Sequence, residues 1–210
     1  MSSEQTITHD IAGAKLIVPV DALVSAWLEQ QVERSRNFKM LGELMVGESI
    51  AGRIASVPKI GTVWPGEGGI NGGLARDEVG NPYWLIVSPG DVSLQEIEWG
   101  GRGHEEPGAQ SEFDGRANTL ALCESSVDHA AAQRCREIAY EGHKDFYLAA
   151  KRESAVLYAS VPNLFEKAWY WTSTQCSASL AWLQHFGVGT QILAFKTIQG
   201  RVRAVRRLDF

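Results

Sequence analysis

Cysteine is scarce in this chain, with three in 210 residues. Cys123, Cys135 and Cys176 lack the C-x-x-C spacing of common zinc and redox sites. A chain of this length buries enough surface to fold without a disulfide or a metal. We therefore expect reduced thiols and no metal or other cofactor, and a disulfide between Cys123 and Cys135 is left open.

Long hydrophobic runs are also missing. Apolar runs such as residues 14–20 fall far short of the ~20 residues that a membrane-spanning helix needs. The opening MSSEQTITHD has no cationic segment followed by an apolar one, so it is not typical of a secretory signal. The sequence predicts a protein that is cytoplasmic when made, has no membrane partner and leaves the cell only by lysis or as part of a virion.

Positively charged residues are fewer than negatively charged ones: the chain has 20 Lys and Arg and 25 Asp and Glu, which gives a net charge of −5. Such a balance excludes broad coating of nucleic acid, so no nucleic-acid partner is expected. Hydrophobic residues make up 44% of the chain, which excludes wholesale disorder. The 21 glycines lie above the usual ~7% and predict a loop-rich fold.

Residues 1–60 are predicted to form an N-terminal arm, and residues 61–210 a single domain. The arm has β-branched residues at strand-like spacing over 7–18, then Asp21 as a helix N-cap. Apolar positions 20, 24, 27, 28 and 32 trace one stripe of an amphipathic helix. This stripe packs either on the protein's own sheet or on a second subunit, which would make a homo-oligomer through the arm.

The domain is predicted to be α+β. Strands are expected at 72–76 and 83–87 around a turn, and the Gly-rich stretch 100–117 is interpreted as an exposed loop. Helices are expected at 130–139 and 151–160. Four short strands are expected to follow, at 169–174, 181–186, 191–196 and 201–208.

The last ninety residues carry an ordered set of motifs. They are Ala131 and Cys135; Gly142, Asp145 and Phe146; Leu148 and Glu153; Tyr170-Trp171-Thr172-Ser173-Thr174; Ala181-Trp182; Phe186 and Gly189; Lys196; and Val202-Arg203-Ala204-Val205-Arg206. In order and spacing this set resembles the C-terminal domain family of the Legionella collagen-like adhesin, in its prophage-type members. Phe146-Tyr147 and Ala149 depart from the family's usual Trp-Arg and Pro.

The resemblance implies a C-type-lectin-like fold, with a twisted, mostly antiparallel sheet, two helices and extensive ordered loops. Residues 176–198 are also similar to the diversified binding segment in variable proteins of diversity-generating retroelements; the alternative is an ordinary strand and turn. The ligand-binding positions that this likeness implies are Ser177, Ser179, Leu183, His185, Thr190, Ile192, Leu193 and Phe195. The residues assigned to the structural scaffold are Trp171, Trp182, Phe186 and Arg203.

The sequence contains no recognisable metal-binding or catalytic motif. The oxygen-ligand tripeptides of calcium-dependent sugar binding are missing, and the three cysteines lack the copper-site pair of formylglycine-generating enzymes. No catalytic residue is therefore predicted. The C-terminal arginines are expected to bond loop carbonyls and carboxylates rather than nucleic acid.

Three functions remain open at this point. The first is a non-enzymatic phage or prophage recognition protein that binds a protein or glycan ligand. The second is an intracellular phage accessory or anti-defence protein that binds and inhibits a host complex. The third, least supported by the residues, is an enzyme of the formylglycine-generating type.

Overall fold

The structure is a computed structural model that describes residues 6–11, 14–19, 57–91 and 96–210 of the chain. It divides into a unit of residues 1–56 and a unit of residues 57–210, where the sequence had suggested a boundary after residue 60. In the first unit, β1 (Thr6–Ile11) and β2 (Ala14–Pro19) form an antiparallel hairpin within the segment predicted to be extended. The helix predicted after Asp21 lies outside the described residues.

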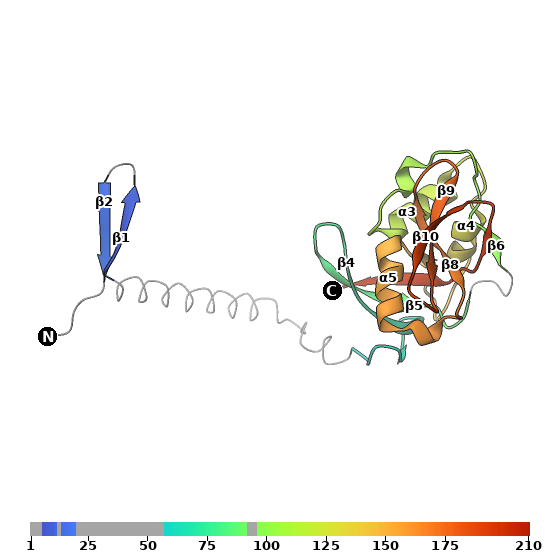
Figure 1. Cartoon of the computed structure of the whole chain (residues 1–210). Helices are drawn as coiled ribbons and strands as arrows, with labels where there is room; N and C mark the ends of the chain where they lie inside the picture. The colour runs from blue at the N-terminus through green and yellow to red at the C-terminus, as the bar shows by residue number, and fades with distance from the viewer. Residues whose placement is uncertain (1–5, 12–13, 20–56, 92–95) are drawn as a thin grey trace. The chain divides into compact units, whose positions relative to one another are not determined.

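The second unit, residues 57–210, is α+β with mostly antiparallel strands (Figure 1). Its strands are β3 (Val63–Trp64), β4 (Gly69–Arg76), β5 (Pro82–Val87), β6 (Ile97–Glu98), β7 (Tyr147–Leu148), β8 (Trp169–Gln175), β9 (Leu180–His185), β10 (Gln191–Phe195), β11 (Gln199–Gly200) and β12 (Ala204–Asp209). Its helices are α3 (Gly115–Glu124), α4 (Ala130–Arg136) and α5 (Lys151–Ser160), with short 3-10 helices at Pro107–Ala109 and Pro162–Leu164.

The strands form a five-stranded sheet in the order β3-β4-β5-β12-β7, a three-stranded sheet in the order β10-β9-β8, and a small β6–β11 pair. The predicted β4–β5 hairpin, the helix at 151–160 and the strands that became β8, β9 and β10 are confirmed. Figure 1 shows α5 alongside β4, which it contacts.

The prediction of two helices is corrected to three within the described part of the domain. The additional helix, α3, begins inside the stretch interpreted as an exposed loop. Asp114 caps it, because its carboxylate accepts a hydrogen bond from the Ala117 backbone N–H at 2.8 Å. Asn118, in the same helix, is buried, and its amide donates to the Ser111 carbonyl at 2.7 Å, so the preceding turn is fixed as well.

Two hydrophobic cores lie on opposite faces of the five-stranded sheet. Leu148 and Ala204 are cross-strand partners, and both point into a core with α3, α4 and Trp171. Their neighbours Tyr147 and Val205 are also partners, and both point into a second core with α5 and β5. Because successive side chains of a strand point to opposite faces, β7 and β12 join the two cores.

Arginines of the last strand segment anchor the loops around it, as the sequence predicted. Arg203 is buried; its guanidinium donates to the Ser88 carbonyl at 2.7 Å and to the Leu164 carbonyl, and it lies near Asp91. Arg206 pairs with Asp145 at 2.7 Å and Glu67 at 2.9 Å. These side chains therefore connect the C-terminal strand to segments far away in the sequence.

Replacing Arg203 tests this anchoring. Arg203→Ala leaves the Ser88 and Leu164 carbonyls and the Asp91 carboxylate without their donor, so we expect a loss of about 3 kcal/mol in the free energy of unfolding. Arg134→Ala is the matched control, because Arg134 forms only an exposed pair with Glu137 and should cost less than about 0.5 kcal/mol. Urea denaturation of both variants provides the comparison, and equal losses would contradict the anchoring role.

Candidate functional site

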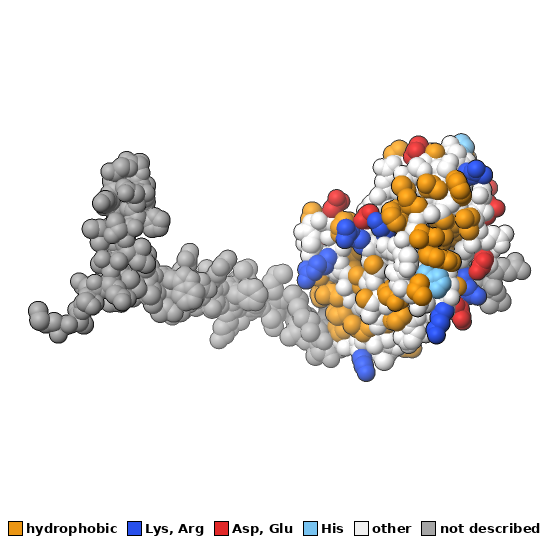
Figure 2. All heavy atoms as spheres, viewed as in Figure 1, with side chains coloured by type: hydrophobic (Ala, Val, Ile, Leu, Met, Phe, Trp, Pro, Cys, Tyr) orange, Lys and Arg blue, Asp and Glu red, His pale blue; other side chains and the backbone are white. Residues whose placement is uncertain are grey.

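The outward face of β9 and β10 is apolar and accessible to solvent. The strand register pairs Leu193 with Trp182 and Phe195 with Leu180, so these four side chains share one face. Leu193 is 39% exposed and Phe195 53% exposed, whereas Leu180 and Trp182 are half-buried. Figure 2 shows hydrophobic side chains gathered over β9 and β10. We call these four residues the β9–β10 face.

The opposite face of the same two strands belongs to the core. Ala181, Leu183 and Ala194 are buried there, against Trp171 and the helices α3 and α4. Leu183 is only 2% exposed, so its predicted role in ligand binding is corrected: a ligand cannot reach it in the folded chain. Ile192 pairs with Leu183 on this inner side, but it remains 39% exposed because it lies at the border of the sheet.

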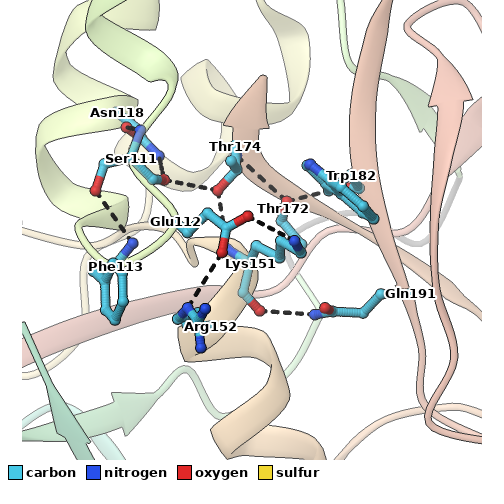
Figure 3. Close-up of polar contacts among 10 residues, drawn as sticks. All are labelled: Ser111, Glu112, Phe113, Asn118, Lys151, Arg152, Thr172, Thr174, Trp182 and Gln191. Carbon is cyan, nitrogen blue, oxygen red and sulfur yellow. Dashed lines mark hydrogen bonds and ion pairs between the residues drawn. The ribbon is translucent and has the colours of Figure 1, made fainter. Parts of the chain in front are cut away.

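A cation covers part of the aromatic surface of the β9–β10 face (Figure 3). The Lys151 ammonium group lies 3.8 Å from the centroid of the Trp182 ring, within the range of a cation–π interaction. It also pairs with Glu112 at 2.6 Å, and Arg152 pairs with the other oxygen of that carboxylate at 3.2 Å. The hydrogen bond from Lys151 keeps the pKa of Glu112 below its ordinary value. This border of the face is therefore charged.

The N-terminus of α5 is held against β8 and β10 by hydrogen bonds. The Gln191 side-chain amide donates to the Lys151 carbonyl at 2.7 Å, and the Lys151 backbone N–H donates to the Thr174 hydroxyl at 3.0 Å. Thr172 donates its hydroxyl to the Trp182 carbonyl at 3.0 Å. Together these bonds fix the position of Lys151 beside Trp182.

The other predicted ligand-binding residues flank the face at its two turns. Ser177 and Ser179 are half-buried in the turn before β9, where the Ser179 N–H donates to the Ser177 hydroxyl at 3.4 Å. His185 is half-buried at the end of β9, and its Nδ1 accepts from the Gly187 N–H at 2.9 Å. Thr190 is exposed. Of the predicted set, Thr190, Ile192, Leu193 and Phe195 present the most accessible side chains.

The scaffold residues are placed as predicted with one exception. Trp171 is buried and donates its indole N–H to the Ile97 carbonyl at 3.0 Å, and Phe186 stacks on Phe165 with ring centroids 3.7 Å apart. Trp182, assigned to the scaffold, is instead half-buried on the β9–β10 face. Trp182 and Lys151 were not predicted as site residues, because only the fold brings Lys151 to the tryptophan.

Lys196 ties the end of β10 to the Gly-rich segment that was expected to be an exposed loop. Its side chain is fully buried, and its ammonium group donates to the His104 carbonyl at 2.9 Å and to Gln175 Oε1 at 2.7 Å. The ammonium also lies 4.6 Å from the centroid of the Trp99 ring. Burial lowers the pKa of Lys196. The segment is thus anchored from within.

The acidic residues of the same segment also form internal bonds. Glu105 accepts from the Gln175 side chain at 2.9 Å and from the Ala178 N–H at 2.8 Å. Glu106 accepts from Ser125 at 2.7 Å and lies 3.0 Å from Nε2 of the buried His129, whose pKa is lowered by burial. Nowhere in the described ranges do three or more His, Cys, Asp or Glu side chains converge as they would around a metal ion.

A shallow groove of about 440 Å³ between β4 and α5 is a second candidate site. Its walls are mainly apolar, with Leu74, Phe113 and Val156, and Arg152 at its border. Glu153 lies beneath it and is engaged internally, because its carboxylate accepts from Tyr83, from Tyr147 and from the Ala150 N–H. The groove therefore offers contact area but few free polar groups.

No family model matches the sequence, and no curated protein matches it. Among the residues that the structure describes, no helix combines the length and the apolar content that crossing a bilayer requires. The three cysteines are free, with Cys135 buried and Cys176 exposed.

Glu153 should make stability depend on pH. Burial raises its pKa to about 7 from 4.5. Between these values the folded protein keeps a proton that the unfolded chain releases, so the free energy of unfolding falls as pH rises, by up to about 1.4 kcal/mol per pH unit. Glu153→Gln cannot ionise and lacks this slope.

The measurement is urea denaturation of the wild type and Glu153→Gln from about pH 5 to about pH 8. The difference between the two curves isolates Glu153 from His129, whose lowered pKa acts in the opposite direction at acidic pH. A difference that stays constant across the range would show that Glu153 ionises normally in the folded state.

Proposed function

We propose that this chain is a non-enzymatic recognition protein of the phage or prophage type, and that its β9–β10 face binds a protein ligand. The observation that carries the proposal is an exposed apolar face on a rigidly supported hairpin. Exposed apolar side chains that gather in one place are typical of interaction surfaces. Phe195 and Trp182 supply aromatic side chains, which dominate the energetics of such interfaces, and Leu193 adds exposed apolar area.

The chemistry of the face favours a protein over a glycan. A sugar requires a free aromatic ring and several polar groups that orient its hydroxyls. Here Lys151 already occupies a position over Trp182, and the amide of Gln191 is engaged with a backbone carbonyl. An apolar centre with charged residues at its border is the usual composition of a protein–protein interface.

A C-type-lectin-like fold belongs to the same proposal. The α+β architecture, the mostly antiparallel sheets and the long ordered segments anchored by Lys196 and Arg203 support it. In such a fold, a rigid frame would hold the β9–β10 face while residues at the adjoining turns vary. The motif resemblance of residues 120–208 is the second support.

Binding partners can be selected directly with the full-length chain, from a yeast-displayed library of bacterial protein domains and, in parallel, from a glycan array. We expect protein binders whose Kd rises at least about tenfold for Phe195→Ser, because Phe195 is the most exposed large side chain of the β9–β10 face and truncation of an aromatic anchor commonly costs this much or more. Val79→Ser is the matched control, since Val79 is an apolar residue that is 84% exposed and lies in the β4–β5 turn, outside the β9–β10 face. Its Kd should stay within about twofold.

Three outcomes would overturn the proposal. Binders that tolerate Phe195→Ser would place recognition elsewhere, and binders only among glycans would refute the protein ligand. A chain that binds nothing in either collection would contradict a recognition function.

A further inference from the structure

β10 is the edge strand of the three-stranded sheet. The strand order is β10-β9-β8, so β10 pairs with β9 along one side and, in the described part of the chain, has no strand along its other side. In an antiparallel ladder, the backbone groups of alternate residues point toward the partner strand and those of the others point away. The outward residues of an edge strand therefore hold hydrogen-bonding groups for which the sheet provides no partner.

The hydrogen bonds at the two ends of β10 identify these outward residues. The Thr190 carbonyl accepts from the His185 N–H at 2.9 Å, and the Lys196 N–H donates to the Ser179 carbonyl at 3.0 Å. The backbone N–H and carbonyl groups of the even-numbered residues of this segment thus point toward β9. The backbone groups of Gln191, Leu193 and Phe195 consequently face away from it.

These outward groups are largely unpaired. Within residues 57–91 and 96–210, nothing hydrogen-bonds to the backbone N–H or carbonyl of Gln191 or Leu193. At Phe195 the carbonyl accepts from the Ile198 N–H at 2.9 Å, while its own N–H has no such partner in these ranges. The edge offers three donors and two acceptors along a five-residue strand.

Proteins usually protect an edge of this kind with proline, an inward charge or a covering element. β10 contains neither proline nor a charged residue, and its sequence is Gln-Ile-Leu-Ala-Phe. Three of its five side chains, those of Ile192, Leu193 and Phe195, are exposed. An apolar edge with free backbone groups is suited to pairing with another strand.

We propose that the β10 edge binds an extended segment of the partner protein, which adds to the sheet as a fourth strand. This inference rests on the proposed function, because the added strand extends the β9–β10 face. The residue opposite Leu193 would exchange two backbone hydrogen bonds with it. The side chain of that residue would pack beside Leu193, and the side chains of its two neighbours would pack on the opposite face, beside Ile192. Because both of these positions are apolar, a segment with apolar side chains on both faces is selected.

A positive charge at one end of β10 predicts how the bound segment is oriented. The Arg102 guanidinium lies 5.5 Å from the centroid of the Phe195 ring, at the end of β10 nearest the Gly-rich segment. It is exposed and forms no ion pair with any described residue. The ligand is therefore expected to carry Asp or Glu at the end that reaches Phe195, where the two charges attract.

The test uses a phage-displayed library of random linear peptides, panned on the full-length chain. We expect enriched peptides with a short run of consecutive apolar residues and an acidic residue at one end. In the free protein, the amides of Gln191, Leu193 and Phe195 should exchange quickly with solvent, while those of Ile192 and Ala194 are protected. Bound peptide should slow exchange at the first three by at least about tenfold.

Leu193→Pro and Leu193→Ala form a matched pair. Both lose the leucine side chain, but only proline loses the outward N–H, and it keeps the β9 ladder intact because that N–H does not face β9. The peptide Kd should rise at least about tenfold more for proline than for alanine. Thermal unfolding of both variants verifies the fold, and the exchange measurement on the wild type does not depend on either variant.

The outcomes separate this inference from the proposed function. Suppose that a partner no longer binds the Phe195→Ser variant but binds Leu193→Pro and Leu193→Ala with equal Kd. That result would refute strand addition and would leave the proposed role of the β9–β10 face standing. Partners unaffected by all three variants would refute both. Absence of enriched peptides, unchanged exchange at Gln191 and Leu193, or pairing of β10 with a second copy of the chain would also refute the peptide-binding edge.

Discussion

The pairing register of β8, β9 and β10 is the constraint on which the site depends. Ala181, Leu183 and Ala194 must face the core for the helices α3 and α4 to pack, and this fixes which side chains remain outside. A slip of one residue would bury Trp182 and expose Leu183, because the side-chain period of a strand is two. The exposed face and the free backbone groups of β10 follow from this single choice.

Buried charge makes the surrounding surface rigid. Lys196 directly follows β10, and its ammonium group is bonded to the His104 carbonyl and Gln175 rather than to water. A buried ammonium group without such acceptors would cost much free energy. The hydrogen bond to the His104 carbonyl therefore fixes the Gly-rich segment next to Lys196. One glycine of that segment, Gly101, has φ of +59° and packs on the His129 ring, where a larger residue would clash. A surface supported in this way loses little freedom when a partner binds.

Local signals predicted much of the fold. The turn between β4 and β5 and the helix α5, which stops before Pro162, needed no tertiary information. The helix α3 was missed because its first residues, Gly115 and Arg116, continue a polar, Gly-rich stretch, and its cap at Asp114 resembles a loop residue. Tertiary contacts with α4, β7, β8 and the 3-10 helix at Pro107–Ala109 stabilise a helix at that position.

The candidate site was predicted in part, for a physical reason. Both faces of β9 and β10 are apolar in sequence, so alternation alone cannot decide whether Leu183 or Trp182 is buried. The size of its aromatic ring favoured a core position for Trp182. In the structure Trp182 lies on the outer face, where the Lys151 ammonium group covers part of its ring. The arginine contacts were predictable, since a cationic closing strand in an acidic chain requires carbonyl and carboxylate partners.

The carboxyl group of Glu153 links β5 to β7 and the N-terminus of α5, about seventy residues further along the chain. Tyr83 of β5 and Tyr147 of β7 both donate to the same oxygen at 2.8 Å, and the N-terminus of α5 donates to the other. Loss of one tyrosine hydroxyl removes a hydrogen-bond donor from the buried acid. Loss of the acid leaves the Tyr147 hydroxyl without its acceptor, whereas the Tyr83 hydroxyl also lies 3.1 Å from the Phe113 carbonyl. A homologue with phenylalanine at both tyrosine positions is therefore expected to have an uncharged residue in place of the glutamate.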